Sequence, residues 1–260
     1  MPLEAPLAPV DARSSDLNAR YRHHSATAVL EHAMSDAQVG RIVMVSSFGA
    51  ESVALLHMVS VIDRSVPVLF LDTQMLFAET LEYQRDVAEK LGLTDVRVIA
   101  PDRTELFLRD PEGDLHLSDP DACCTLRKIV PLEDALEPFD AWITGRKRFH
   151  GGKRADMEFF EVQDGRIKVN PLAHWAPQDV QDYITNNRLP RHPLVAKGFP
   201  SIGCAPCTSH VAEGEDPRAG RWRGRAKLEC GIHFVNGKAV PTRLTARGQH
   251  AYFEQEEDLR

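Results

Sequence analysis

The stretch of sequence that decides the fold is RIVMVSSFGAESVALLHMVSVI, residues 41–62. Residues 41–46 are a short run of β-branched and apolar side chains, which predicts a strand. Phe48 and Gly49 are typical of a tight turn, and residues 50–62 place apolar side chains at roughly helical spacing. A strand, a turn and a helix are therefore expected in this order.

The same alternation continues along the chain. Further strands are expected at residues 66–71, 96–100 and 141–144, and helices at residues 77–91, 101–109 and 122–136. The strands are apolar almost throughout, which is typical of a parallel sheet covered by helices on both faces. The predicted fold class is therefore a three-layer α/β/α arrangement around a parallel sheet. Ligands of such sheets bind beyond the carboxyl ends of the strands.

The pattern changes after Gly145. Asp164 and Gly165 lie between two short apolar runs and predict a hairpin, while residues 177–187 predict a helix. Residues after Gly198 are rich in Gly, Pro and Cys and show little periodicity. Two units are therefore expected: an α/β domain over residues 1–209, poorly ordered in residues 1–25, and a mobile C-terminal tail over residues 210–260.

Composition limits the classes of function. The chain has 260 residues, of which 43% are hydrophobic and 27% charged, enough for one substantial core. The net charge of −7 argues against nucleic-acid binding, which depends on Lys and Arg. No apolar run approaches the ~20 residues needed to cross a bilayer, and residues 1–25 contain no signal-peptide core. A cytoplasmic protein without a membrane partner is expected, and its oligomeric state stays open, a homo-oligomer included.

Two stretches are locally basic. Residues 218–227 contain no acidic side chain, and they carry Arg218, Arg221, Arg223, Arg225 and Lys227. Such a run either binds a small anionic substrate or forms a solvated, flexible segment. The second stretch, residues 146–154, contains two further candidate anion contacts, Arg148 and Arg154, although each also fits a surface charge.

The five cysteines divide into two tight pairs and a single residue. The pairs are Cys123 with Cys124 and Cys204 with Cys207, and only the fold can bring one pair next to the other. Four converging thiolates suit zinc or an iron–sulfur cluster. Disulfides are less favoured in the expected compartment. A redox dithiol at Cys204 and Cys207 is a further alternative, but the pair does not open a helix after a strand. The remaining Cys230 is the candidate nucleophile.

Two loops at predicted strand ends are candidate substrate contacts. Ser47, Phe48 and Gly49 lie where a strand leads into a helix, whose backbone N–H groups can face an anion. An ordinary turn is the alternative. Asp72 and Thr73 end the next strand at the same edge, where they either face the ligand or only order the connection. A phosphate or sulfate cradle is therefore predicted, and it lacks the Gly-Lys-Ser/Thr ending of a Walker loop.

Together these motifs resemble those of assimilatory sulfonucleotide reductases, in the branch that reduces adenosine 5′-phosphosulfate (APS). The resemblance covers residues 40–235, nearly the whole fold. It rests on segments that follow the family's order: SFGAES at 47–52, LDT at 71–73, FAET at 77–80, CCTLRK at 123–128, WITG at 142–145, NPL at 170–172, GCAPC at 203–207 and KLECGIH at 227–233. Agreement of several spaced motifs is far more specific than any single one.

The resemblance implies an adenine nucleotide alpha-hydrolase-like fold and the reduction of APS to sulfite and AMP. It further implies thioredoxin or glutaredoxin as the reductant and an S-sulfonate intermediate on Cys230. Together, the two cysteine pairs would hold one [4Fe-4S] cluster, with structural zinc as the alternative. Lys128, Arg218 and Arg221 correspond to residues that hold the phosphosulfate group in the family.

Three other interpretations stay open. A reductase of 3′-phosphorylated APS (PAPS), or one that accepts both nucleotides, is disfavoured because that branch typically lacks the four cluster cysteines. An adenylating enzyme of the same fold would carry a Ser-Gly-Gly-x-Asp-Ser-like loop, whereas residues 47–52 are SFGAES. If the protein were a zinc-stabilised binding module, Cys230 and the basic run at residues 218–227 would have no function.

Overall fold

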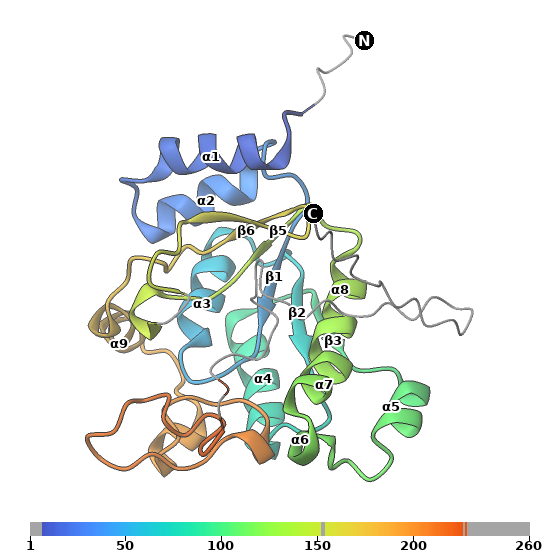
Figure 1. Ribbon diagram of the computed structural model, residues 1–260. Coiled ribbons are helices and arrows are strands. Elements are labelled where there is room, and N and C mark those ends of the chain that lie inside the picture. Colours follow the sequence, from blue (N-terminus) through green and yellow to red (C-terminus); the bar gives the residue numbers. More distant parts are fainter. Residues whose placement is uncertain (1–6, 152–153, 226, 228–260) are drawn as a thin grey trace, which may run out of the picture.

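The structure, a computed structural model, describes residues 7–151, 154–225 and 227 (Figure 1). A six-stranded sheet in the order β3-β2-β1-β4-β6-β5 forms its centre. The strands are β1 (Ile42–Ser46), β2 (Val68–Leu71), β3 (Val96–Ile99), β4 (Ala141–Ile143), β5 (Phe160–Gln163) and β6 (Arg166–Val169). All pairs are parallel except β5 with β6, whose hairpin turns at Asp164 and Gly165 with φ of 52° and 74°. The predicted α/β/α fold class is confirmed, with one antiparallel edge strand added.

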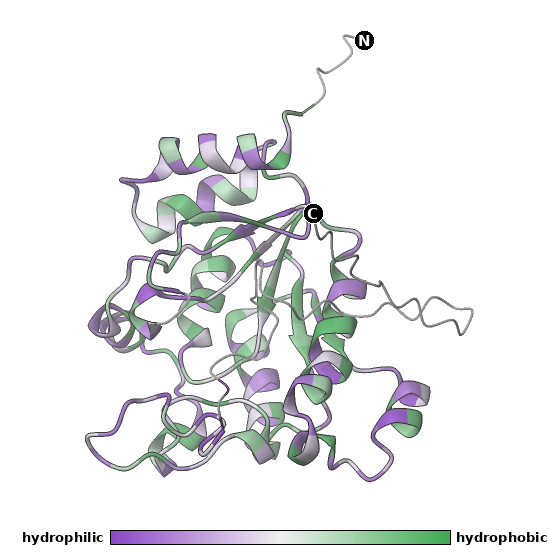
Figure 2. Cartoon of the chain, viewed as in Figure 1, coloured by the Kyte–Doolittle hydropathy of each residue, from purple (hydrophilic) through white to green (hydrophobic). Residues whose placement is uncertain are grey.

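Helices cover both faces of the sheet. Their bounds are α1 (Val10–Tyr21), α2 (Ala26–Ser35), α3 (Ser52–Ile62), α4 (Ala78–Leu91), α5 (Arg103–Arg109), α6 (Leu115–Ser118), α7 (Pro120–Cys124), α8 (Val130–Leu136) and α9 (Pro177–Asn186). Successive strand residues point to opposite faces, so Met44 packs with α3 and α4 whereas Val43 and Val45 pack with α8. Figure 2 shows β1 and β2 hydrophobic along their length, as burial on both faces requires.

Residues 10–21 form helix α1, so the expectation of a poorly ordered segment over residues 1–25 is wrong for this part of it. Helix α1 lies beside α2 and against the edge of the sheet formed by β5 (Figure 1). Asn18 accepts a hydrogen bond from the Phe160 N–H (2.9 Å) and donates one to the Phe160 carbonyl (2.6 Å). Leu17 and Tyr21 are buried. The helix is polar overall, and these edge contacts hold it where a strong apolar stripe is missing.

The helix expected at residues 122–136 begins earlier and is not regular. It starts at Pro120 after Asp119, whose carboxylate accepts from the N–H groups of Asp121 and Ala122. A π-helical turn, Thr125–Ile129, separates α7 from α8. Pro131 explains the turn, because proline has no N–H to donate to residue 127 and its ring clashes with that carbonyl. The tandem cysteines therefore lie directly before a widened turn, a feature that is frequent at functional sites.

The segment after Cys207 packs onto the main domain. Ser209 N–H donates to the Gly220 carbonyl (2.8 Å), Trp222 N–H donates to the Cys207 carbonyl (3.1 Å), and the Trp222 side chain is buried. The boundary predicted after residue 209 therefore has no counterpart in residues 209–225, which are held by the cysteine segment. The rest of the predicted tail, with Cys230, lies outside the described residues.

Among the described residues, no helix combines the length and the apolar character that a membrane span requires.

A buried histidine gives the fold a pH dependence. His192 is 1% exposed; its Nδ1 accepts from Leu194 N–H (3.2 Å) and its Nε2 lies 3.1 Å from Thr80 Oγ1. Burial lowers the pKa of His192 from 6.5 to about 4. Because the folded protein resists protonating this ring, stability present above pH 6.5 is lost as pH falls toward 4.

We therefore expect His192 to contribute about 3 kcal/mol to the pH dependence of unfolding across that window. Urea titrations between pH 7.5 and 4.5 should show a steeper loss of unfolding free energy in the wild type than in His192→Asn, which retains a side chain able to cap Leu194. Parallel pH profiles of the two proteins would contradict this assignment.

Candidate functional site

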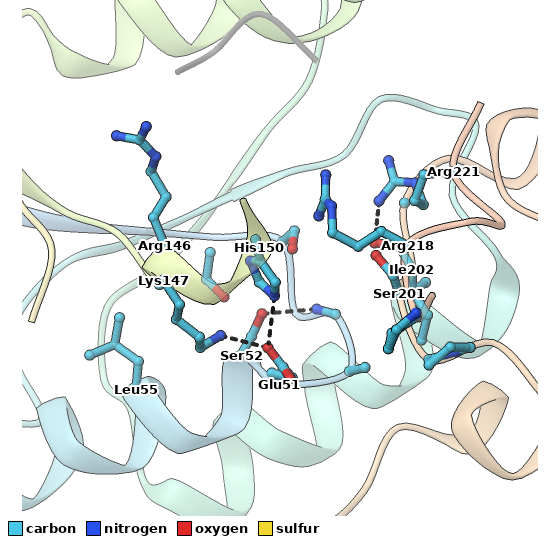
Figure 3. A pocket seen from close by; sticks show the side chains of 18 of the residues that line it. Glu51, Ser52, Leu55, Arg146, Lys147, His150, Ser201, Ile202, Arg218 and Arg221 are labelled. Atoms are coloured by element: carbon cyan, nitrogen blue, oxygen red, sulfur yellow. Dashed lines mark hydrogen bonds and ion pairs between the residues drawn. The ribbon is translucent and has the colours of Figure 1, made fainter. Parts of the chain in front are cut away.

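A cavity of about 640 Å³ opens at the carboxyl ends of the central strands (Figure 3). Its walls come from the ends of β1, β2 and β4, from residues 200–204 and from residues 216–222. This is the edge at which parallel sheets bind ligands, as the sequence predicted. The parts of the site are therefore assembled from segments far apart in the chain.

The loop after β1 forms one wall. Ser46 Oγ accepts from Phe48 N–H (3.1 Å), and Ser52 Oγ accepts from Gly49 N–H (3.1 Å), so the turn is fixed by its own serines. Ser47 and Gly49 line the cavity as predicted. Phe48 does not: its backbone has φ of +46°, and its buried ring packs edge-on against Phe70. Phe48 anchors the loop to the core rather than facing a ligand.

An ionised carboxylate lies within this wall. Glu51 Oε2 accepts a hydrogen bond from Lys147 Nζ (2.7 Å) and lies 3.6 Å from His150 Nε2 (Figure 3). Burial alone would raise the pKa of Glu51, but the contacts with His150 and Lys147 outweigh it and lower the pKa to about 2. Burial lowers the pKa of Lys147 and of His150. Glu51 lies within the loop predicted to cradle an anion, but it was not itself among the predicted contacts.

The two arginines of the second basic stretch that were predicted as anion contacts have different positions. Arg154 is buried, lines the cavity and donates from NH1 to His150 Nδ1 (3.0 Å). Arg148 does not line the cavity; it donates to the Met157 carbonyl (2.6 Å) and to Glu158 (3.2 Å). The surface-charge alternative therefore holds for Arg148.

Of the two predicted contacts at the end of β2, only one lines the cavity. Thr73 is buried and lines the cavity, with Oγ1 3.2 Å from Cys204 Sγ. Asp72 lies outside the lining, and its carboxylate accepts from Gln74 N–H (2.8 Å) in a turn where Gln74 has φ of +58°. Asp72 thus orders the connection, which was the alternative to ligand binding.

The two cysteine pairs share one site. Cys123, Cys124 and Cys204 are buried, Cys207 is half-buried, and none of these four forms a disulfide. Burial, and then the neighbouring Cys124, raise the pKa of Cys123 to about 11; Arg127 lowers it, and Cys204 and Cys207 raise it further. The chain is brought together here by an isolated bridge between Leu76 and Cys204 and by Ala205 N–H donating to the Met75 carbonyl (2.7 Å).

Lys128 links the thiols to the cavity. It lines the cavity, and its ammonium contacts Cys204. Burial would raise the pKa of Cys204, but Lys128 and the Thr73 hydroxyl outweigh it and lower the pKa. For Cys207, burial and the charge of Cys204 raise the pKa. Cys204 therefore loses its proton more readily than an ordinary cysteine, and the thiolate is the form that binds a metal.

Three buried thiols and one half-buried thiol on two segments are the donor set of a soft metal centre, and they fit an iron–sulfur cluster by ligand chemistry. Among the described residues, no group of three or more His, Cys, Asp or Glu side chains is arranged to hold a single metal ion.

The basic run divides between the cavity and the surface. Arg218 and Arg221 line the cavity (Figure 3). Arg221 donates to the Ile202 carbonyl (3.1 Å) and lies directly over Gly203, where a Cβ atom would come within 2.2 Å of the guanidinium. Arg223 instead pairs with Glu215 (2.8 Å) at the surface. A side chain at residue 203 would therefore displace the Arg221 guanidinium from this position.

Comparison with known proteins gives three kinds of match. Residues 41–210 match the profile of the phosphoadenosine phosphosulfate reductase domain. A protein of Chelativorans sp. (strain BNC1), named adenosine 5′-phosphosulfate reductase, is 50% identical over 235 residues, which are 89% of this chain and 96% of that protein. A protein of the same name from Mesorhizobium japonicum is 48% identical over 86% of this chain and 89% of its own length.

Solved structures agree with the fold. Phosphoadenylyl-sulfate (PAPS) reductase from Candida auris, in a phosphate complex, superimposes with a TM-score of 0.65 at 26% identity, covering 80% of this chain and 99% of that one. FMN adenylyltransferase from Candida glabrata has a TM-score of 0.52 at 14% identity over 80% of this chain and 76% of that one, and shares the fold alone. The chain therefore belongs to the sulfonucleotide reductases, the family of the phosphoadenosine phosphosulfate reductase domain.

Proposed function

We propose that the protein reduces APS to sulfite and AMP in assimilatory sulfate reduction. The observation that carries the proposal is the cationic end of the cavity, where Lys128, Arg218 and Arg221 face a nucleotide-sized space beside Cys204. Such cations screen the charge of a phosphosulfate and of the phosphate that leaves. The relatives named adenosine 5′-phosphosulfate reductase, which match most of the chain, support the same substrate.

The proposed reaction has two steps. The Cys230 thiolate attacks the sulfur of APS, an S–S bond forms, and the S–O bond to the phosphate breaks, with its electron pair leaving on AMP. A thiolate of a dithiol protein, thioredoxin or glutaredoxin, then attacks Cys230 Sγ and releases sulfite. Its second thiol resolves the mixed disulfide, so the dithiol supplies both electrons and Cys230 returns as a thiolate. A cytoplasmic location would supply such reductants in reduced form.

Cys123, Cys124, Cys204 and Cys207 would hold a [4Fe-4S] cluster, with structural zinc as the alternative. When bound, the cluster would supply an electrostatic environment for the anionic substrate rather than reducing electrons. The residues of the chain do the rest: Lys128 lies between a cysteine sulfur and the cavity, and Thr73 orients Cys204.

Two measurements test this proposal. Protein purified without oxygen should contain iron and acid-labile sulfide and show the broad absorption of an iron–sulfur cluster; stoichiometric zinc without sulfide would favour the alternative. The ratio kcat/KM should be higher for APS than for PAPS. A preference for PAPS, the substrate named in the Candida auris enzyme of similar fold, would show the sister activity instead.

A further inference from the structure

The segment that leads to Cys230 is attached to the helices around the tandem cysteines. Arg225 NH1 donates to the His116 carbonyl in α6, and Lys227 Nζ donates to the Pro120 carbonyl (3.5 Å) at the start of α7. Lys227 also forms an ion pair with Asp121, two residues before Cys123. Two basic side chains thus tie this segment to α6 and α7.

Trp222 forms the other side of the attachment. Its indole is buried and its backbone has φ of +50°. The backbone N–H of Trp222 donates to the Cys207 carbonyl. The Arg221 guanidinium lies 4.5 Å from the centre of the indole ring, and Lys227 Nζ lies 5.9 Å from it. Cations over an indole face are attracted by its negative π-surface. One ring therefore contacts both a cation of the cavity and the cation at the start of the Cys230 segment.

The burial of Lys227 is unusual for a lysine. Its side chain is 10% exposed, although its partner Asp121 is 82% exposed. Burying an ammonium is unfavourable unless specific partners replace water. A carboxylate, a carbonyl and an aromatic face replace it here. The position of Lys227 is therefore defined on three sides.

The fixed position of Lys227 limits how far away the nucleophile Cys230 can lie. Cys230 follows Lys227 by three residues, which span at most about 11 Å when fully extended. The thiol must therefore act close to α7, whose C-terminal end leads into the turn that brings Lys128 to the cavity.

We propose that Lys227 is a positioning residue: held by Asp121 and Trp222, it fixes the start of the segment that carries Cys230, so that this thiol meets the bound sulfonyl group. This inference rests on the proposed function. Because Asp121 is exposed, the ion pair contributes little to stability. Its effect is on geometry, and a misplacement of about 1 Å can slow a reaction about 100-fold.

The test uses the full-length holoenzyme and single-turnover release of AMP from APS without reductant. Lys227→Met and Asp121→Asn should each lower this rate about 10- to 100-fold. The double variant should be no slower than the slower single variant, because both changes remove one interaction. Asp121→Lys/Lys227→Asp should recover part of the rate. Arg41→Met, which breaks an exposed ion pair with Asp140 at the opposite end of β1, is the matched control and should keep the wild-type rate.

Affinity separates positioning from binding. In a Cys230→Ser background, which does not consume APS, adding Lys227→Met should leave the Kd for APS unchanged. Iron and sulfide content should also match the wild type in Lys227→Met and in Asp121→Asn, a control that is needed because Asp121 is close to Cys123. An unchanged single-turnover rate, a Kd raised by the factor lost in rate, or fully multiplicative single effects would each overturn the proposal.

A second readout distinguishes this inference from the proposed function. Hydrogen–deuterium exchange in the peptide covering residues 221–227 should be faster in Lys227→Met and in Asp121→Asn than in Arg41→Met. If the variants show this pattern but the wild-type protein releases no AMP from APS, the proposed function is wrong while the attachment stands. If APS is consumed and exchange is equal in all variants, the attachment is wrong.

Discussion

Replacing Cys230 with serine is expected to lower single-turnover release of AMP from APS by about 10⁴-fold or more, the scale of losing a catalytic nucleophile. A serine hydroxyl is far less nucleophilic toward sulfur and is not ionised near neutral pH. Mass spectrometry of the wild type after mixing with APS should show an added sulfonyl group on the peptide containing Cys230, absent from the variant.

The affinity of Cys230→Ser for AMP should stay that of the wild type, because the cavity cations come from other segments. This control excludes unfolding as the cause. Full single-turnover release of AMP by Cys230→Ser would refute the thiolate mechanism. A defect that appears only in steady-state turnover would mean that Cys230 acts only in the second step, the release of sulfite by the dithiol protein.

Arg127→Met is expected to destabilise the protein by about 3–5 kcal/mol, the scale of breaking a buried ion pair. The Arg127 side chain is 7% exposed and Asp110 is 0% exposed; the guanidinium donates to Asp110 from Nε (3.1 Å) and NH2 (2.6 Å) and to the Thr73 carbonyl from NH1 (3.0 Å). Its loss leaves a buried carboxylate without its cation. For a chain of this length, the unfolding midpoint should fall by about 10 °C.

The matched control is Arg97→Met, which breaks an exposed pair with Asp95 and should cost no more than about 1 kcal/mol. Asp110→Leu/Arg127→Met should be less destabilised than Arg127→Met, because no unpaired charge stays buried. Equal midpoints for Arg127→Met and Arg97→Met, measured on protein with equal iron content, would contradict this account.

Much of the fold follows from periodicity in the sequence. Residues 41–62 predicted β1, its turn and α3, because an apolar run, a glycine and helical spacing act locally. The hairpin at Asp164 and Gly165 was predicted for the same reason. Helix α1 was missed, since it is held by Asn18 bonding to the backbone of Phe160, a pairing that no local pattern reveals.

The candidate site was partly predictable from residue type. The thiols and the basic run were selected for what they can bind, and Lys128 was selected from the family resemblance; Cys204, Lys128 and Arg221 do meet at one cavity. Orientation was not predictable: Phe48 and Arg148 lie in the right segments but point elsewhere. Glu51, Lys147 and His150 form a cluster only after the β1 and β4 ends are brought together by the sheet.

The π-helical turn at Thr125–Ile129 also bears on how such a site can change in evolution. Each residue of an α-helix rotates the chain by about 100°, so the loss of one residue from this turn, together with replacement of Pro131, would restore regular winding and swing Cys123 and Cys124 away from their partners. The packing of α8 against the sheet would not change, because Leu132 and Leu136, which belong to the hydrophobic cluster with β1 and β2, follow the turn in the sequence. One deletion and one substitution would thus remove the proposed metal centre from a descendant protein while sparing its core.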